Sequence, residues 1–340
     1  MIVTVRKERI ERNLKNMRLA SGKPLILMCK ANGYGHGMLE VARAEAAAYG
    51  VATEEEGARL RAVVRKDILL SAPRTSALNL VEEHDLVPII GEEEYLKSAV
   101  FSGKVRRCHL KVDSGMHRMG FRSPKECVEA ALFLAEHGVR LEGIATHYKE
   151  SGENVKRQNQ AFDACLEAIF GAYAAKELPL PITHVTASGR AEAGKYDMLR
   201  VGLAAYGYGE LSSLAPAMEV SSEILCVKRI AKGDTLGYGG AFLADRPLTA
   251  CTVLGGYADG IDRREVGREV ICKGVRCRIA AVCMDTFEVV TERVDLSVGD
   301  RVIIMSEELD AAYIARRRGS IPYEVLVGYD TPRAERRYDE

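Results

Sequence analysis

A lysine stands directly after the first strong apolar run of the chain. The run is Leu25–Cys29, and Lys30 opens the string Lys-Ala-Asn-Gly-Tyr-Gly-His-Gly that follows it. A short apolar run of this kind predicts a buried strand, and a lysine at its carboxyl end would be partly buried. Burial lowers the pKa of an amine and makes it a better nucleophile toward an aldehyde. Position alone leaves a plain alternative, a lysine whose stem covers apolar surface while its ammonium reaches water.

Other polar residues take the same position relative to later apolar runs. They are Lys111, His147, Ser188 and Arg200, and Arg118 follows a few residues after one run, in a loop. Parallel strands of a closed barrel end at one mouth, where barrel enzymes keep their active sites. We therefore expect these side chains to share a site. For Lys111 the residues also allow a plain interpretation, a buried strand lysine paired with Asp113 or another acid.

The elements that must position these residues alternate between apolar runs and helix-like stretches. Eight runs predict eight parallel strands of a (β/α)8 TIM-type barrel: Leu25–Cys29, Tyr49–Ala52, Asp67–Ser71, Leu86–Ile90, Cys108–Val112, Leu141–Thr146, Ile182–Ala187 and Met198–Gly202. After Gly209 the chain becomes rich in Val, Ile, Thr and Cys between glycines, which predicts a mostly antiparallel β domain. The boundary is expected near 208–216, with a barrel domain at 1–210 and a β domain at 211–340.

Composition narrows the class of protein. The 340 residues are 47% hydrophobic, and 48 basic residues balance 48 acidic ones. Zero net charge does not favour nucleic acid or an anionic membrane as a partner. The charged start and the lack of a long apolar run predict a cytoplasmic protein without a signal peptide. The nine cysteines show no Cys-x-x-Cys spacing, so we expect reduced thiols and no metal site.

Several short motifs, taken together, resemble those of the alanine racemase family. The Lys30 string is similar to the family's Lys-Ala-x-x-Tyr-Gly-His-Gly signature. Further similar blocks follow in family order: Lys111-Val-Asp-Ser-Gly-Met-His-Arg118, Thr146-His147-Tyr148, Arg200-Val-Gly202-Leu203, Leu236-Gly-Tyr238-Gly, Gly256-Tyr257-Ala-Asp-Gly260, Cys283-Met284-Asp285 and Tyr329-Asp-Thr-Pro-Arg333. These blocks extend over residues 30 to 333, so the resemblance covers nearly the whole chain.

The resemblance implies a cofactor, pyridoxal 5'-phosphate, and a role for each matching residue. Lys30 would carry the cofactor as a Schiff base and act as one base, while Tyr238 of the other subunit of a homodimer would act as the second. Arg200 would face the pyridine nitrogen, and His147 would link Arg200 to Tyr238. The implied phosphate donors are Tyr34, Ser188, Tyr329 and the backbone at Gly202 and Leu203. Arg118 and the backbone at Met284 would hold the substrate carboxylate, and Tyr257 with Tyr329 would narrow the pocket. In some family members the lysine at the position of Lys111 is carbamylated.

The implied activity is interconversion of L- and D-alanine, the source of D-alanine for the bacterial cell wall. The alternatives are a racemase for serine or a larger amino acid, a decarboxylase on the same fold, and a non-catalytic pyridoxal phosphate-binding protein. Ala280-Ala281 stand where the family carries a Gly-Arg pair of its substrate entry corridor, which keeps the amino-acid preference open. Arg200 speaks against the decarboxylase, because that class favours an acidic partner for the pyridine nitrogen. Tyr238 and the β domain speak against the non-catalytic protein.

Overall fold

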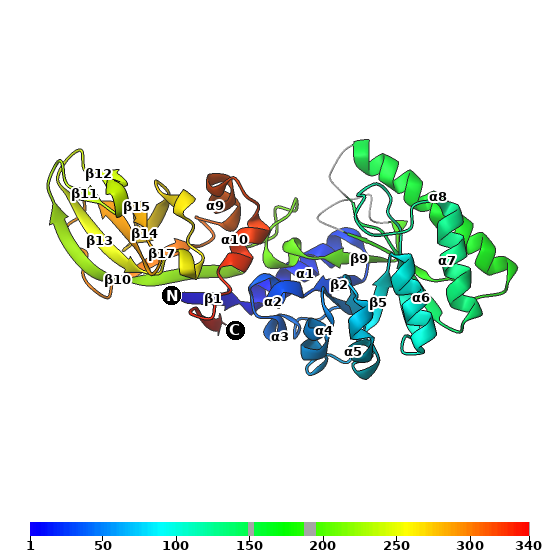
Figure 1. The fold of residues 1–340 in the computed structure, drawn as a ribbon. Coiled ribbons are helices and arrows are strands. Elements are labelled where there is room, and N and C mark those ends of the chain that lie inside the picture. Colours follow the sequence, from blue (N-terminus) through cyan, green and yellow to red (C-terminus); the bar gives the residue numbers. More distant parts are fainter. Residues whose placement is uncertain (149–152, 187–194, 340) are drawn as a thin grey trace.

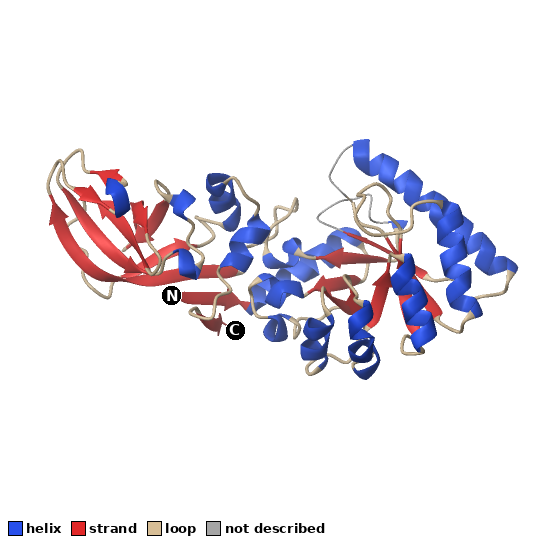
Figure 2. Cartoon of the chain, in the orientation of Figure 1, coloured by secondary structure: helices blue, strands red, loops and turns tan. Residues whose placement is uncertain are grey.

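The computed structural model describes residues 1–148, 153–186 and 195–339, which form two lobes (Figure 1). Figure 2 shows helices around the strands of one lobe, whereas strands dominate the other. The first lobe is the predicted barrel and the second the predicted β domain, so the fold class is confirmed. Within the described residues, no helix is both long and apolar enough to cross a membrane.

The barrel lobe is a closed ring of eight parallel strands. The strands are β2 (Leu25–Met28), β3 (Ala48–Val51), β4 (Ile68–Leu70), β5 (Val87–Ile90), β6 (Arg107–Lys111), β7 (Arg140–Ala145), β8 (Ile182–Thr186) and β9 (Met198–Val201). The ring closes where β2 pairs with β9 in parallel, with Leu25 opposite Leu199 and Leu27 opposite Val201. Strands β2, β3, β4 and β5 are buried along their whole length, because helices cover one face and the barrel interior the other.

Helices connect the barrel strands along the outside of the ring (Figure 2). They are α1 (Lys7–Ser21), α2 (Lys30–Tyr34), α3 (Met38–Val41), α4 (Glu54–Arg61), α5 (Leu78–Glu83), α6 (Glu93–Ser102), α7 (Pro124–Glu136) and α8 (Glu153–Ala175), with the 3-10 turns η1 (Thr75–Ala77) and η3 (Leu203–Tyr206). Local sequence fixes several starts. Ser123 and Glu126 form a capping box at the start of α7, and Thr53 and Glu56 form another at α4.

The second lobe is built on one eight-stranded sheet in the order β13-β16-β15-β14-β17-β10-β1-β18. Its strands are β1 (Ile2–Arg6), β10 (Met218–Ile230), β13 (Leu248–Leu254), β14 (Glu269–Cys272), β15 (Val275–Val282), β16 (Thr286–Thr291), β17 (Arg301–Met305) and β18 (Glu335–Asp339). The small pair β11 (Thr235–Leu236) and β12 (Phe242–Leu243), the 3-10 turns η4 (Tyr238–Gly240), η5 (Tyr257–Asp259) and η6 (Arg263–Glu265), and the helices α9 (Ala311–Arg318) and α10 (Pro322–Gly328) complete it.

Both chain termini belong to this sheet. Strand β1 pairs antiparallel with β10 and parallel with β18, so the first and last strands of the chain lie side by side. The division at residues 210 and 211 therefore stays a prediction, since the sheet of the second lobe also takes a strand from the start of the chain.

Two predicted elements differ from the structure. The sequence pattern of 37–48 predicts one helix, but only Met38–Val41 is helical, because a tight turn at 31–37 precedes it. The apolar segment Glu269–Val282 predicts one strand, but the structure has a hairpin there. Its turn residues Lys273 and Gly274 both have positive φ, 47° and 75°, as a two-residue hairpin turn requires.

Candidate active site

Five basic side chains gather at the mouth of the barrel. Lys30 follows β2, Lys111 ends β6, Arg118 lies in the loop after β6, His147 lies just past β7, and Arg200 lies on β9. The charges of Arg118 and Arg200 lie close enough to lower the pKa values of Lys30, Lys111 and His147. The structure thus brings five of the six side chains of the predicted shared site to one mouth, while the sixth, Ser188, lies outside the described residues.

Lys30 is the partly buried amine of this group. Burial is the main cause that lowers its pKa, and the charges of Arg118 and Arg200 act in the same direction, while Glu56 opposes them. A larger fraction of this amine is therefore neutral at pH 7 than for a free lysine. A neutral amine among cations is the state that attacks an aldehyde.

Lys111 shows the same effect more strongly. Burial, followed by the charges of Arg200, Arg118 and Lys30, lowers its pKa to about 8, and Asp113 only partly opposes them. Asp113 accepts hydrogen bonds from the backbone N–H groups of Gly115 and His117 instead, and so shapes the loop that carries Arg118. The positive charge of Lys111 is therefore only partly compensated by the negative charge of Asp113.

Arg200 is buried and engaged by a network that the sequence reading missed. Its Nη1 donates to His184 Nδ1 at 2.6 Å and to the His184 carbonyl at 3.0 Å. Its Nη2 donates to the Thr146 carbonyl and, at 3.1 Å, to Thr186 Oγ1. These bonds use all four Nη hydrogens, so the Nε hydrogen is the donor left for a ligand. Burial lowers the pKa of Arg200 to about 10, so it stays charged at neutral pH.

The direction of this network fixes two histidine tautomers. Because a guanidinium only donates, His184 must accept at Nδ1 and carry its proton on Nε2. That proton points to His109 Nδ1, 2.7 Å away, so His109 is also neutral. Burial lowers the pKa of His109 to about 3 and that of His184 well below its usual value. A histidine at the centre of each of the two barrel strands β6 and β8 is the signal that could have revealed this hydrogen-bonded chain.

His147 is joined to Arg200 through a threonine. Thr186 Oγ1 lies 2.7 Å from His147 Nδ1 and also accepts from Arg200. Burial, and then the charges of Arg200 and Arg118, lower the pKa of His147 to about 3. The predicted link between Arg200 and His147 therefore runs through Thr186.

The buried neutral histidines predict a loss of stability in mild acid. His36, His109, His147 and His184 have lowered pKa values in the folded chain, to about 4 for His36, but bind protons near pH 6.5 when unfolded. Below pH 6.5 the unfolded state therefore binds more protons than the folded state, so the free energy of unfolding decreases as the pH is lowered. Each group contributes up to roughly 1.4 kcal/mol per pH unit.

Denaturant unfolding between pH 6.5 and 4.5, at one protein concentration, measures this slope. His36→Gln should lower the slope by about a quarter, since it removes one of four such groups. The exposed His137 is the matched control, and His137→Gln should leave the slope unchanged. A free energy of unfolding that does not change between pH 6.5 and 4.5 would contradict the claim that these histidines are buried in their neutral form.

A small cradle lies beside the end of β9. The Oη of Tyr34 lies so close to Gly202 that a Cβ on this glycine would stand 2.5 Å from it. Gly202 also precedes η3, whose first N–H groups, beginning at Leu203, have no partners inside the turn. Burial raises the pKa of Tyr34, so its phenol keeps its proton and can donate. Ser188, the other predicted phosphate donor, lies outside the described residues.

Tyr329 lies fully buried at the end of α10. Its ring lies 5.8 Å from the guanidinium of Arg318, and no hydrogen-bond partner of its Oη is found among the described residues. Helix α10 packs against α2, the turn that begins at Lys30. Tyr329 therefore follows a helix that contacts the Lys30 turn, but its hydroxyl makes no hydrogen bond to the described residues of the barrel mouth.

The remaining three predicted residues form a second group in the other lobe. Tyr238 lies in η4 with 84% of its surface exposed, and Met284 is 53% exposed. Both line one hollow of about 490 Å³. The backbone N–H of Tyr257, which is 47% exposed, bonds to the Cys283 carbonyl in the wall of that hollow. Figure 1 places β11 and β12, which flank Tyr238, at the end of this lobe far from the barrel.

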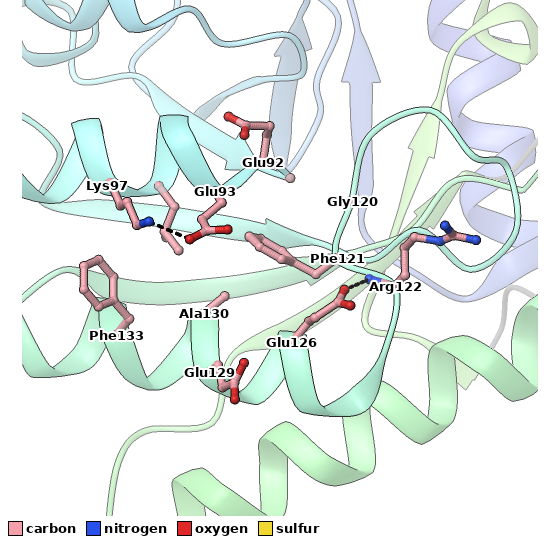
Figure 3. Close-up of a pocket in the computed structure, with 12 residues that line it drawn as sticks. Glu92, Glu93, Lys97, Gly120, Phe121, Arg122, Glu126, Glu129, Ala130 and Phe133 are labelled. Atoms are coloured by element: carbon pink, nitrogen blue, oxygen red, sulfur yellow. Dashed lines mark hydrogen bonds and ion pairs between the residues drawn. The ribbon is translucent and has the colours of Figure 1, made fainter.

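A further hollow, of about 410 Å³, lies between α6 and α7 on the outside of the barrel (Figure 3). Two of its four glutamates cap the starts of the two helices, and the other two, Glu93 and Glu129, form ion pairs with lysines. Glu92 accepts from the N–H groups of Glu94 and Tyr95, and Glu126 accepts from that of Arg122. We therefore place the candidate site at the barrel mouth, where the titratable groups gather.

Comparisons with known proteins agree with this arrangement. The family model for the alanine racemase N-terminal domain matches residues 5–210, and that for the C-terminal domain matches 217–338. The alanine racemase of Deinococcus radiodurans is 33% identical, over 96% of this chain and 96% of its own, and that of Ligilactobacillus salivarius is 32% identical, over 91% and 90%. The crystal structure of alanine racemase from E. faecalis superimposes with a TM-score of 0.90 at 31% identity, covering 99% of this chain and 98% of its own. The chain belongs to the alanine racemase family.

Proposed function

We propose that this protein is a pyridoxal phosphate-dependent racemase that interconverts L- and D-alanine. The observation that carries the proposal is the group of cations at the barrel mouth around Lys30, an amine with a lowered pKa. Such a site suits a ligand with several negative groups, and it contains an amine that loses its proton more readily than a free lysine, as attack on an aldehyde cofactor requires.

The residues at the mouth fit pyridoxal phosphate. The glycine cradle at Gly202 with the Tyr34 hydroxyl and the first N–H groups of η3 would hold its phosphate. The Nε hydrogen of Arg200 would face the pyridine nitrogen, and Lys30 would hold the aldehyde carbon covalently. When bound, the cofactor supplies an electron-withdrawing ring that weakens the Cα–H bond of the substrate. Ser188 and Tyr329 remain proposed phosphate donors.

Filling the cradle should weaken cofactor binding. In Gly202→Ala the new methyl group would stand 2.5 Å from Tyr34 Oη, so the phenol or the turn must move. We expect the Kd for pyridoxal phosphate to rise by about ten- to a hundredfold, the equivalent of losing one or two hydrogen bonds. Gly171→Ala is the matched control, because a Cβ there meets nothing within 4 Å. Equal affinities of the two variants, by titration of the apoenzyme, would disprove the phosphate assignment.

A racemase must add a proton to either face of a planar carbon. Lys30 serves one face, because it lies on one side of the substrate. The other face needs a second acid or base, and Tyr238 is the proposed group. Its exposure in the far lobe supports a head-to-tail homodimer in which Tyr238, Tyr257 and Met284 of the partner subunit complete the barrel mouth. Arg118 and the Met284 backbone would then hold the substrate carboxylate.

The link from Arg200 through Thr186 to His147 prepares the site for a tyrosine. It keeps a cation fixed beneath a neutral imidazole, and positive charge lowers the pKa of a nearby phenol. In the proposed dimer this charge would stabilise the phenolate of Tyr238 when it acts as the second base.

Incubation with single L-amino acids in heavy water tests the proposed activity. Alanine is expected to gain α-deuterium and become racemic. Serine and larger amino acids should react at least about tenfold more slowly, because Tyr257 and Tyr329 are proposed to leave little room for a larger side chain. Faster racemisation of serine than of alanine would overturn the substrate assignment. Decarboxylation of the amino acid, or no exchange of the α-proton while the cofactor is bound, would overturn the assignment as a racemase.

A further inference from the structure

The turn that follows Lys30 has an unusual handedness. Ala31, Asn32, Gly33 and Tyr34 have φ values of 50°, 51°, 65° and 54°, so four consecutive residues form one left-handed helical turn. Each side chain in such a turn crowds the following carbonyl, which is why L-residues enter it singly rather than in series. The turn needs support from the rest of the chain, and it carries both Lys30 and Tyr34.

The last segment of the chain contacts this turn at one side chain, that of Asn32, and at one backbone carbonyl, that of Gly35. Asn32 Nδ2 donates to Asp330 Oδ1 at 3.1 Å, and Arg336 Nε donates to the carbonyl of Gly35 at 3.3 Å. Arg336 Nη2 also bonds to the same Asp330 oxygen. Asp330 and Arg336 therefore form one bracket that holds the turn at Asn32, inside it, and at Gly35, directly after it.

Tyr338 closes the bracket over Gly37. A Cβ at Gly37, whose φ is 91°, would stand 1.9 Å from Tyr338 Oη, so the phenol lies directly against the backbone. Strand β18 is itself fixed, since it pairs in parallel with β1 and places Arg336 opposite Val3 and Tyr338 opposite Val5. The segment that supports the turn is thus anchored in the sheet of the second lobe.

Alternation along β18 separates the residues that face the turn from those that do not. Arg336 and Tyr338 are partly buried, whereas Glu335 before them and Arg337 between them are exposed and pair with each other at 2.7 Å. Successive side chains of a strand point to opposite faces. Arg337 therefore offers a matched control one residue away from Arg336.

We propose that Asp330, Arg336 and Tyr338 are positioning residues that hold the left-handed turn and thereby orient Lys30 and Tyr34. This role in the reaction rests on the proposed function, but the structural part of it does not. None of the three is expected to touch substrate. Loosening the bracket should lower kcat through misplacement of Lys30 and leave KM nearly unchanged.

Backbone hydrogen exchange of the holoenzyme, read on peptides that cover residues 30–37, is the test. Arg336→Ala should speed exchange there by about tenfold or more, because the turn loses its bond at Gly35 and Asp330 loses the arginine that holds it, while barrel peptides distant from α2 stay unchanged. Arg336→Lys should give an intermediate rate, since one ammonium keeps the bond to Asp330. Tyr338→Phe should give a smaller local increase, and Arg337→Ala none.

Kinetics on the same variants separate positioning from general stability. Arg336→Ala should lose about tenfold in kcat with a KM change below about twofold, and Arg336→Lys should recover part of the loss. Unchanged exchange at 30–37 in Arg336→Ala, or an equal change in Arg337→Ala, would overturn the proposal. If Arg336→Ala does not fold, Arg336→Lys and Tyr338→Phe decide by the same two readouts. A wild-type protein without racemase activity would refute the proposed function, while the exchange result would still decide whether the bracket exists.

Discussion

Lys30→Ala is expected to abolish covalent attachment of pyridoxal phosphate and to lower kcat by at least about 10⁴-fold. The side chain has two proposed tasks, to bond the cofactor aldehyde and to move one α-proton. Its lowered pKa supports both, since the neutral amine is the nucleophile and also the base. Borohydride treatment of the wild-type holoenzyme, followed by peptide mapping, should find the reduced cofactor on Lys30 alone.

Lys111→Arg is the matched control for this change. Lys111 lies at the same mouth and also has a lowered pKa, of about 8. Arginine keeps its charge but cannot replace a lysine as nucleophile. We expect borohydride to fix the cofactor on Lys30 in this variant as in the wild type. Reduced cofactor on Lys111, or trapping that survives in Lys30→Ala, would refute the assignment.

Tyr238→Phe is expected to lower racemisation of either enantiomer by roughly 10²- to 10⁴-fold, the usual contribution of a positioned acid or base. The loss of exchange should be one-sided. Lys30 is proposed to take the proton of D-alanine and Tyr238 that of L-alanine, so exchange from α-deuterated D-alanine should survive far better than exchange from L-alanine.

Exchange from each enantiomer, measured with the cofactor bound, checks this division. Because Tyr238 is 84% exposed in the single chain, the substitution should leave the melting temperature nearly unchanged. Tyr313→Phe, on α9 outside both groups of site residues, is a suitable control. Equal loss of exchange from both enantiomers would mean that Tyr238 is structural or that the faces are assigned the wrong way round.

The barrel was predictable because its signal is local. The strands coincide with short apolar runs such as Leu25–Met28, and several of their ends are marked by a polar residue such as Lys111 or His147. Strands β1 and β18 were not predicted, since they exist only through partners more than 200 residues away, as in the pairing of Ile2 with Ser221 and Glu335. Helix α10 was missed because it has only seven residues.

The site was predictable to a similar extent. Strand ends gave the cations of the barrel mouth, whereas Tyr238 could be assigned only through the family resemblance, since its sequence surroundings are those of an ordinary turn. The histidine chain behind Arg200 was missed, because His109 and His184 lie on different strands and meet only inside the closed barrel. The bracket around the Lys30 turn was missed for the same reason, since Asn32 and Asp330 are 298 residues apart.

The central claim is that each active site combines Lys30 of one subunit with Tyr238 of the other, and mixed dimers test it most directly. Lys30→Ala and Tyr238→Phe chains should each be nearly inactive alone. If they are unfolded together, mixed in equal amounts and refolded, half of the dimers should be mixed, and each of these should carry one intact site. The activity should then return to about a quarter of the wild-type value, as a shared two-fold interface requires. If every site lay within one subunit, no intact site could form, and activity that stayed at the level of the separate variants would contradict the account.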